Sequence, residues 1–253
     1  MTRRHSPIIF LGPTLNRAIA AKICNADFRP PAAMGDVTRA ACEGPETIVL
    51  IDGVFEDRPA VWHKEILWAL SKGIAVIGAA SMGALRAAEL QDHGMLGHGK
   101  IYQAYASGEL QDDDEVAVVH GPAETGFMPL TDAMVDMREA IGHAEIEGVL
   151  TAEEAVAAIG CAKAHHFKVR NLNKVLHAVL QQSQTARQIS QTLEWFASRP
   201  AGAKANDAHD LLTNLDSITA KARELACRVP PFVPTVYLHR LEAFGYRHSS
   251  EAI

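Results

Sequence analysis

The residues best suited to chemistry lie where an apolar run breaks into small residues, in the string GAASMGALRAAEL that begins at Gly78. Ala79, Ser81 and Gly83 have the spacing of the G-x-S-x-G nucleophile elbow, with alanine in place of the first glycine. Ser81 could therefore be a nucleophile, with the amides of Met82 and Gly83 stabilising an oxyanion. Two alternatives stay open: Ser81 caps a helix and contacts an anionic ligand, or it only caps the helix.

Glycine and polar residues follow each of the four apolar runs that we expect to form strands. In parallel sheets, ligands collect beyond the carboxyl ends of the strands. We therefore expect the segments that follow the runs to meet at one edge of the sheet and to form a binding site there. These segments are Gly12-Pro13-Thr14, Asp52-Gly53, Gly78 to Gly83, and His120-Gly121-Pro122.

Two histidines are candidates for a general base. His120 directly follows a predicted strand, where an exposed side chain has no evident packing role, so it is the preferred base. His63 lies near the start of a predicted helix, on its apolar face. It is either a hydrogen-bonded core histidine or a base oriented by Asp52 or Glu65.

Arg86 and Glu89 lie three positions apart on the helix that follows Ser81. At this spacing they could form a modest surface ion pair. Alternatively, Arg86 faces the site and holds a carboxylate or a similar anion.

Two charged stretches have a structural and a functional interpretation. The clustered carboxylates of residues 112–115 could hold Mg²⁺ or Ca²⁺, but they lack the spacing of a calcium loop and precede the predicted strand Val116–Val119. We expect them in a solvated loop at the edge of the sheet opposite the site. Residues 155–193 contain no acidic side chain but several basic ones, which would form a basic surface for an acidic partner or simply a solvated face. The basic residues are Lys163, Lys168, Arg170, Lys174 and Arg187.

The composition excludes several classes of protein. The chain has 253 residues, a net charge of −6 and a pI near 6.0, which argues against a dedicated nucleic-acid binder. No apolar run approaches the roughly 20 residues that span a bilayer, and we find no signal peptide. The four cysteines lie far apart, so we expect reduced thiols in the cytoplasm. We expect neither a metal ion nor a cofactor.

Short apolar runs and helical patterns alternate in the first half of the chain, which predicts an α/β domain with a Rossmann-like parallel sheet. Its helices are predicted at residues 59–73 and from Met82 to Leu90, and the domain spans 1–129. Helical patterns follow, with a capping box from Thr151 to Glu154, and predict a helical subdomain at 130–253 that ends in a helix from Thr235 to Phe244. The predicted strands are Ile8–Leu11, Ile48–Ile51, Ile74–Ile77 and Val116–Val119.

About 130 consecutive residues of the first half resemble the TfuA-like family. The resemblance is carried by strings such as IIFLGPTL, DFRPPAAMGDV, WHKEILWAL, GAASMGALRAAEL and MPLTDAMVDMR. The family implies a partnership with YcaO enzymes, which use ATP to activate backbone amides and here install thioamides in peptides or proteins. It also implies a small ThiS-like carrier protein whose C-terminal thiocarboxylate is the source of sulfide. Beyond about residue 145 the resemblance says little.

The resemblance implies site residues within the matching strings: Asp52, His63, Lys64, Glu65, Ser81, Arg86, Glu89, Asp113 and His120. A thiocarboxylate carbon is a poor electrophile until its negative charge is neutralised. Lys64 or Arg86, with the helix N-terminus, could do this. The carriers that the resemblance implies end in a flexible Gly-Gly tail, for which the glycine-rich strand ends could supply a narrow groove. Three functions are compatible with these residues. The first is a thiocarboxylate hydrolase that delivers sulfide to a YcaO enzyme, the second a non-catalytic adaptor or activator, and the third an unrelated serine hydrolase.

Overall fold

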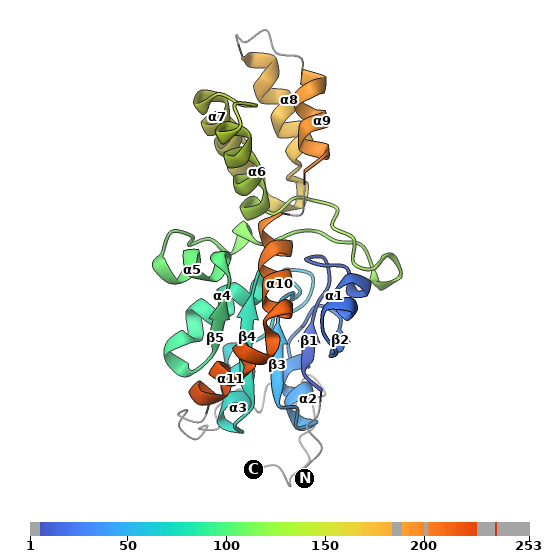
Figure 1. The fold of residues 1–253 in the computed structure, drawn as a ribbon, viewed down its shortest axis with the longest axis vertical. Coiled ribbons are helices and arrows are strands. Elements are labelled where there is room, and N and C mark those ends of the chain that lie inside the picture. The colour runs from blue at the N-terminus through green and yellow to red at the C-terminus, as the bar shows by residue number, and fades with distance from the viewer. Residues whose placement is uncertain (1–5, 184–188, 200–201, 227–235, 237–253) are drawn as a thin grey trace.

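A computed structural model describes residues 6–183, 189–199, 202–226 and 236. Its centre is a five-stranded, fully parallel sheet, which confirms the predicted Rossmann-like α/β class (Figure 1). The strand order β2-β1-β3-β4-β5 is one of the two common doubly wound orders. The strands are β1 (Ile8–Phe10), β2 (Asp27–Arg29), β3 (Thr47–Leu50), β4 (Ala75–Ala79) and β5 (Leu96–His98).

The prediction of a strand at Val116–Val119 is wrong. This segment lies outside the sheet, and it is apolar because Val116 packs against Ile101 and Tyr105 instead. The sequence analysis also missed β2 and β5, whose short sequences DFR and LGH lack a run of Ile and Val. Both are edge strands, and edge strands are often short and polar.

Helices cover both faces of the sheet because the strand side chains alternate between the faces. Ile8 and Phe10 face one layer, formed by α2 (Asp36–Cys42), α3 (His63–Ser71) and α4 (Met82–Leu90). Ile9 and Leu11 face the other, formed by α1 (Arg17–Ile23), α10 (Ala203–Thr213) and α11 (Leu215–Ala226). The helix predicted at 82–90 is confirmed as α4, whereas the one expected from Pro59 begins at His63.

A helical lobe projects from the end of the sheet where the site lies (Figure 1). It has its own apolar core and contains the predicted capping box, in which Thr151 and Glu154 bond reciprocally. The helices after residue 202 return to the sheet, so the second half of the chain does not pack as a single unit. The predicted helix at 235–244 falls outside the described residues except for Val236. The helices of the lobe are α6 (Met134–Ile146), α7 (Ala152–Ala164), α8 (Leu172–Gln182) and α9 (Ile189–Ala197).

Between the sheet and the lobe lie α5 (Lys100–Ser107) and a long connection from α5 to α6. The connection from α5 to α6 contains two single turns of 3-10 helix, at Asp113–Glu115 and Ala123–Thr125, and similar turns occur at Gln91–His93 and Phe167–Val169.

Within the described ranges, no helix combines the length and the apolar character needed to cross a membrane.

Helix α4 lies directly against the backbone of β3 and β4. A Cβ atom on Gly83 would come within 1.7 Å of the Leu50 carbonyl oxygen, and one on Gly78 within 2.0 Å of the Gly83 oxygen. The Gly83 amide donates to the Ile51 oxygen at 3.1 Å. Two glycines thus place the N-terminus of α4 at the ends of β3 and β4.

We expect Gly83→Ala to lower the free energy of unfolding by about 3 kcal/mol, because the clash is with backbone that cannot move aside. Gly142→Ala in α6 is the control, since a Cβ there meets nothing within 4 Å. It should be neutral or stabilising by up to about 1 kcal/mol. Urea unfolding of both variants measures the difference, and equal effects would contradict the close approach described here.

Candidate functional site

The site lies where the strand order reverses, between β1 and β3. A pocket of about 620 Å³ opens at this edge. It is walled by the ends of β3 and β4, the first turns of α4, the connection after α5, and the turn at Phe167 between α7 and α8. Of the residues predicted for the site, it brings together Pro13, Asp52, Ser81, Met82, Arg86, Glu89, Asp113 and His120.

Ser81 occupies the N-cap position of α4, but its side chain makes no capping hydrogen bond. The residue is only 6% exposed and lines the pocket. Its hydroxyl has no hydrogen-bond partner in the described part of the chain. The residue before it, Ala80, has φ of 65°, a conformation that costs a non-glycine residue about 1 kcal/mol or more. The strained turn from β4 to α4 therefore presents the uncommitted hydroxyl of a largely buried serine to the pocket.

Only one of the two amides expected to stabilise an oxyanion is available. The Gly83 amide is committed to the Ile51 carbonyl, so the expectation for Gly83 is wrong. Met82 is the first residue of α4, where an amide has no acceptor within the helix. It lines the pocket beside Ser81, at the positive end of the helix dipole.

His120 lines the same pocket, although not at the end of a sheet strand as predicted. It forms an isolated antiparallel bridge with Pro129, and its ring meets Phe127 edge-on at 5.6 Å. The His120 Nδ1 atom lies 2.8 Å from the Gly121 carbonyl oxygen. A carbonyl only accepts, so Nδ1 carries the proton and Nε2 of the neutral ring has a free lone pair. His120 thus has the tautomer of a base that acts through Nε2.

Arg86, Glu89 and His63 form a charged group at the pocket wall. Arg86 donates to Glu89 at 2.5 Å and to the Val61 carbonyl at 3.2 Å, and the His63 Nε2 lies 2.8 Å from the same Glu89 oxygen. Burial raises the pKa of Glu89, but hydrogen bonds from His63 and Arg86 outweigh it and leave the pKa below its usual value. The predicted pair therefore forms while Arg86 also lines the pocket, whereas His63 does not line it.

Asp52 and Glu65 are the two carboxylates expected to orient His63, but the carboxylate that bonds His63 is that of Glu89. Asp52 and Glu65 accept hydrogen bonds from main-chain amides. Asp52 is 1% exposed and accepts from the Gly12 amide at 2.8 Å and the Thr14 hydroxyl at 2.6 Å, which fixes the loop after β1.

Glu65 is fully buried and accepts from the amides of Gly35 and Trp62 at 2.7 and 3.1 Å. Burial is the main reason why the pKa of Glu65 is raised.

Besides His63, five of the residues predicted for the site do not line the pocket: Gly12, Thr14, Lys64, Glu65 and Gly83. Lys64 is exposed.

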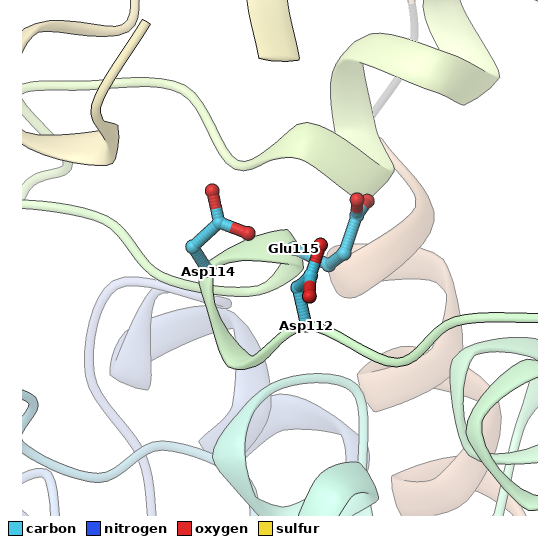
Figure 2. A group of neighbouring side chains, drawn as sticks. All are labelled: Asp112, Asp114 and Glu115. Carbon is cyan, nitrogen blue, oxygen red and sulfur yellow. The ribbon is translucent and has the colours of Figure 1, made fainter. Parts of the chain in front are cut away.

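The acidic segment 112–115 lies at the pocket, not at the opposite edge of the sheet, because the strand expected after it does not form. Figure 2 shows Asp112, Asp114 and Glu115 on this turn, with ligand oxygens within 4.8 Å of one another. The Lys163 ammonium lies among them, at 2.9, 2.5 and 2.9 Å from the three carboxylates. This side chain from α7 supplies the positive charge that the cluster would otherwise need from a cation.

The basic side chains expected to form a surface are largely used inside the protein. Lys163 and Arg170 bind the carboxylates of the acidic segment 112–115, and we call this group of contacts the clamp. Arg170 is fully buried and bonds the Asp114 carboxylate at 2.5 Å and the Asp114 carbonyl at 3.0 Å. Lys168 pairs with Glu56 at 2.6 Å and lines the pocket. Lys174 is exposed, and Arg187 lies outside the described residues. Basic side chains of the lobe thus hold the acidic segment beside the pocket.

We expect the clamp to weaken in acid. Burial raises the pKa of Asp114, but hydrogen bonds from Lys163 and Arg170 bring it below its usual value. Burial, then hydrogen bonds from Arg138 and Lys163, act in the same way on the pKa of Glu115. Carboxylates with lowered pKa values stabilise the fold above the pKa of the unfolded chain, and this contribution is lost as the pH falls through the lowered value.

The free energy of unfolding should therefore decrease as the pH falls below about 4. Urea unfolding at a series of pH values measures this decrease. Glu115→Gln, which cannot titrate, should reduce its slope, and an unchanged slope would show that Glu115 does not contribute.

The sequence analysis missed several residues of the pocket, among them Arg58, Phe55 and Phe167. The rings of Phe55 and Phe167 meet edge-on at 5.3 Å and join the loop after β3 to the helical lobe. Arg58 follows Asp52 closely and lies within the segment that resembles the family, a signal that could have identified it. Phe167 carries no such signal, because its position depends on how the lobe docks.

Residues 52–171 match the family model described as TfuA-like protein. No curated protein matches the sequence. The matched segment begins at Asp52 and includes the elbow, the histidine of the pocket and the clamp. TfuA-like proteins are a known kind of YcaO partner, which gives the chain a role associated with YcaO-dependent thioamidation. The match over residues 52–171 confirms the resemblance to the TfuA-like family that is seen in the sequence.

Proposed function

We propose that this protein hydrolyses the C-terminal thiocarboxylate of a small ThiS-like sulfur carrier and delivers the sulfide to a YcaO enzyme. The observation that supports this most directly is the unpartnered hydroxyl of the largely buried Ser81 in a pocket that also contains His120. The match to the TfuA-like family supports a YcaO enzyme as the partner. The pocket contains residues that can act on an acyl carbon.

The proposed reaction is addition of an oxygen nucleophile to the thiocarboxylate carbon. His120 accepts a proton at Nε2, either from the Ser81 hydroxyl or from a water that Ser81 positions. The Met82 amide and Arg86 stabilise the negative charge that develops on the oxygen and sulfur of the tetrahedral intermediate. Collapse breaks the carbon–sulfur bond, and His120 passes its proton to the departing sulfur, which leaves as hydrosulfide.

In the overall reaction, the thiocarboxylate and one water give a carboxylate and hydrogen sulfide. If Ser81 attacks, the carrier is first esterified to its oxygen, and a water then cleaves the ester with His120 again taking the proton. Hydrosulfide is a better leaving group than an amine, so the reaction needs less help from a general acid than peptide hydrolysis does.

The proposal is tested by measuring sulfide release from a purified thiocarboxylated carrier, with and without the YcaO enzyme. We expect turnover by this protein alone. If it releases no sulfide but stimulates the YcaO enzyme, it is an adaptor and the proposal fails. Turnover of generic esters without turnover of the carrier would instead indicate an unrelated serine hydrolase.

A pair of histidine variants tests the choice of base. His120→Gln should lower sulfide release by about a hundredfold, since a positioned base contributes roughly this factor. His63→Gln is the matched control, because His63 lies outside the pocket, and it should change the rate by less than about fivefold. A larger loss in His63→Gln than in His120→Gln would reverse the assignment.

A further inference from the structure

We propose that a free backbone edge formed by Val118 and His120 binds the tail of the substrate as an added β-strand. The inference rests on the proposed function, in that the tail is taken to be the extended C-terminal segment of a carrier protein. It adds the mode of recognition: main-chain hydrogen bonds align the tail, and its terminal group reaches Ser81.

The edge belongs to a short antiparallel ribbon. The Leu130 amide donates to the Val119 carbonyl at 2.7 Å, and the Gly121 amide donates to the Met128 carbonyl at 2.8 Å. The Val119 amide in turn donates to the Thr131 hydroxyl at 2.8 Å. His120 and Pro129 lie opposite each other between these two bonds, as a pair whose main chains form no hydrogen bond with each other.

This pattern fixes where the remaining backbone groups point. In a strand, the amide and carbonyl of successive residues face opposite edges. Val119 and Gly121 face the 128–131 segment, so Val118 and His120 direct theirs to the other edge. Their main-chain groups have no hydrogen-bond partner within residues 6–183, 189–199, 202–226 and 236, and an unpaired edge of this kind accepts a further strand.

The free edge borders the pocket of Ser81. Val118 and His120 both line this pocket, together with Ala117 and Val119 between and beside them. Side chains alternate in direction along an extended chain. Successive residues therefore line the same cavity only if the main chain itself forms the wall.

An extended peptide C-terminus fits this arrangement better than a small molecule does. The unpaired edge provides hydrogen bonds for main chain, and peptide binding by strand addition uses such edges. The Met82 amide at the N-terminus of α4 and the Ser81 hydroxyl suit a carboxylate or thiocarboxylate at the end of the tail. The ribbon also exposes Met128 and Leu130 at 56% and 57%, which offers apolar contacts to the body of a carrier protein.

The test uses short synthetic peptides ending in Gly-Gly with a free carboxylate, each N-methylated at one backbone position. Binding to the intact protein is measured by fluorescence polarisation. We expect an alternating pattern, in which methylation weakens binding about tenfold at one set of alternate positions and by less than about twofold at the others. No binding, or an even effect along the peptide, would overturn the proposal.

A variant of the protein gives an independent measurement. Val118→Pro removes one amide of the edge and should weaken peptide binding about tenfold. Ala123→Pro, in the exposed turn at the tip of the ribbon, is the matched control and should leave peptide binding unchanged. Equal binding by both variants would overturn the proposal.

The two proposals fail in different ways. If the hydrolase function is wrong, the protein without substitutions releases no sulfide from the carrier, yet the alternating pattern of peptide binding persists. If the edge is wrong, sulfide release from the carrier persists, but N-methylation and Val118→Pro have no selective effect.

Discussion

Replacing Ser81 by alanine should lower sulfide release from the thiocarboxylated carrier by at least about tenfold, and by about a hundredfold or more where Ser81 is the nucleophile. The residue is buried, its hydroxyl is not used for capping, and the strained Ala80 holds it at the turn into α4. Removing the hydroxyl takes away the nucleophile, or the group that positions the attacking water, without disturbing a hydrogen bond of the fold. The rate is measured as sulfide produced under single-turnover conditions.

The size of the loss and the intermediate together distinguish the two roles of Ser81. A nucleophile predicts a carrier–protein ester that mass spectrometry detects in the wild type after rapid acid quench and that is absent from Ser81→Ala. A water-positioning role predicts no ester and a smaller loss, of about tenfold. Ser107→Ala is the control, because Ser107 is exposed and its hydroxyl donates to the Ala104 carbonyl, and this variant should react at the wild-type rate. A wild-type rate in Ser81→Ala would remove Ser81 from the chemistry.

Arg170→Met should lower the free energy of unfolding by about 3 kcal/mol, the lower end of the range for removing one partner of a buried ion pair, because the Asp114 side chain is 27% exposed and keeps its contact with Lys163. The guanidinium is fully buried, and besides Asp114 it bonds the carbonyls of Ala162 and His165 at 3.2 and 3.1 Å. These groups would lose their partners in the apolar replacement. Urea unfolding measures the effect.

Lys174→Met in the neighbouring helix α8 is the matched control for Arg170→Met. Lys174 is an exposed cation of the same lobe, and its loss should change the free energy of unfolding by less than about 0.5 kcal/mol. If both variants lost the same small amount, the clamp would be no stronger than an ordinary surface charge.

The part of the site that could be predicted is the part encoded by local pattern. The break from β4 into α4 is visible in the sequence because small residues at 78–83 interrupt an apolar run and a strong helix former follows. The placement of Asp52 beside the loop after β1 follows from parallel strands alone. The pairing of Arg86 with Glu89 follows from helical spacing.

The parts that could not be predicted depend on contacts between distant segments. Val116–Val119 has the apolar character of a buried strand, but burial against α5 gives the same pattern as burial in a sheet. The wrong strand led to a second wrong prediction, since the acidic segment 112–115 is expected at the edge of the sheet opposite the site but lies at the pocket. Arg170 has no local signal at all, because an exposed and a buried arginine in a loop look alike until its partner at Asp114 is known.

The return of α10 and α11 to the sheet has a consequence for how the chain folds during synthesis. Asp207 and Asp210 in α10 bond the Lys100 amide and His98, across separations of 107 and 112 residues. One face of the sheet, including Ile77 and Val49, is covered by these late helices. It stays open until α10 and α11 have left the ribosome, and contacts of such long range form slowly. The nascent protein therefore presents an apolar surface until these helices are synthesised, which makes it a natural client for chaperones.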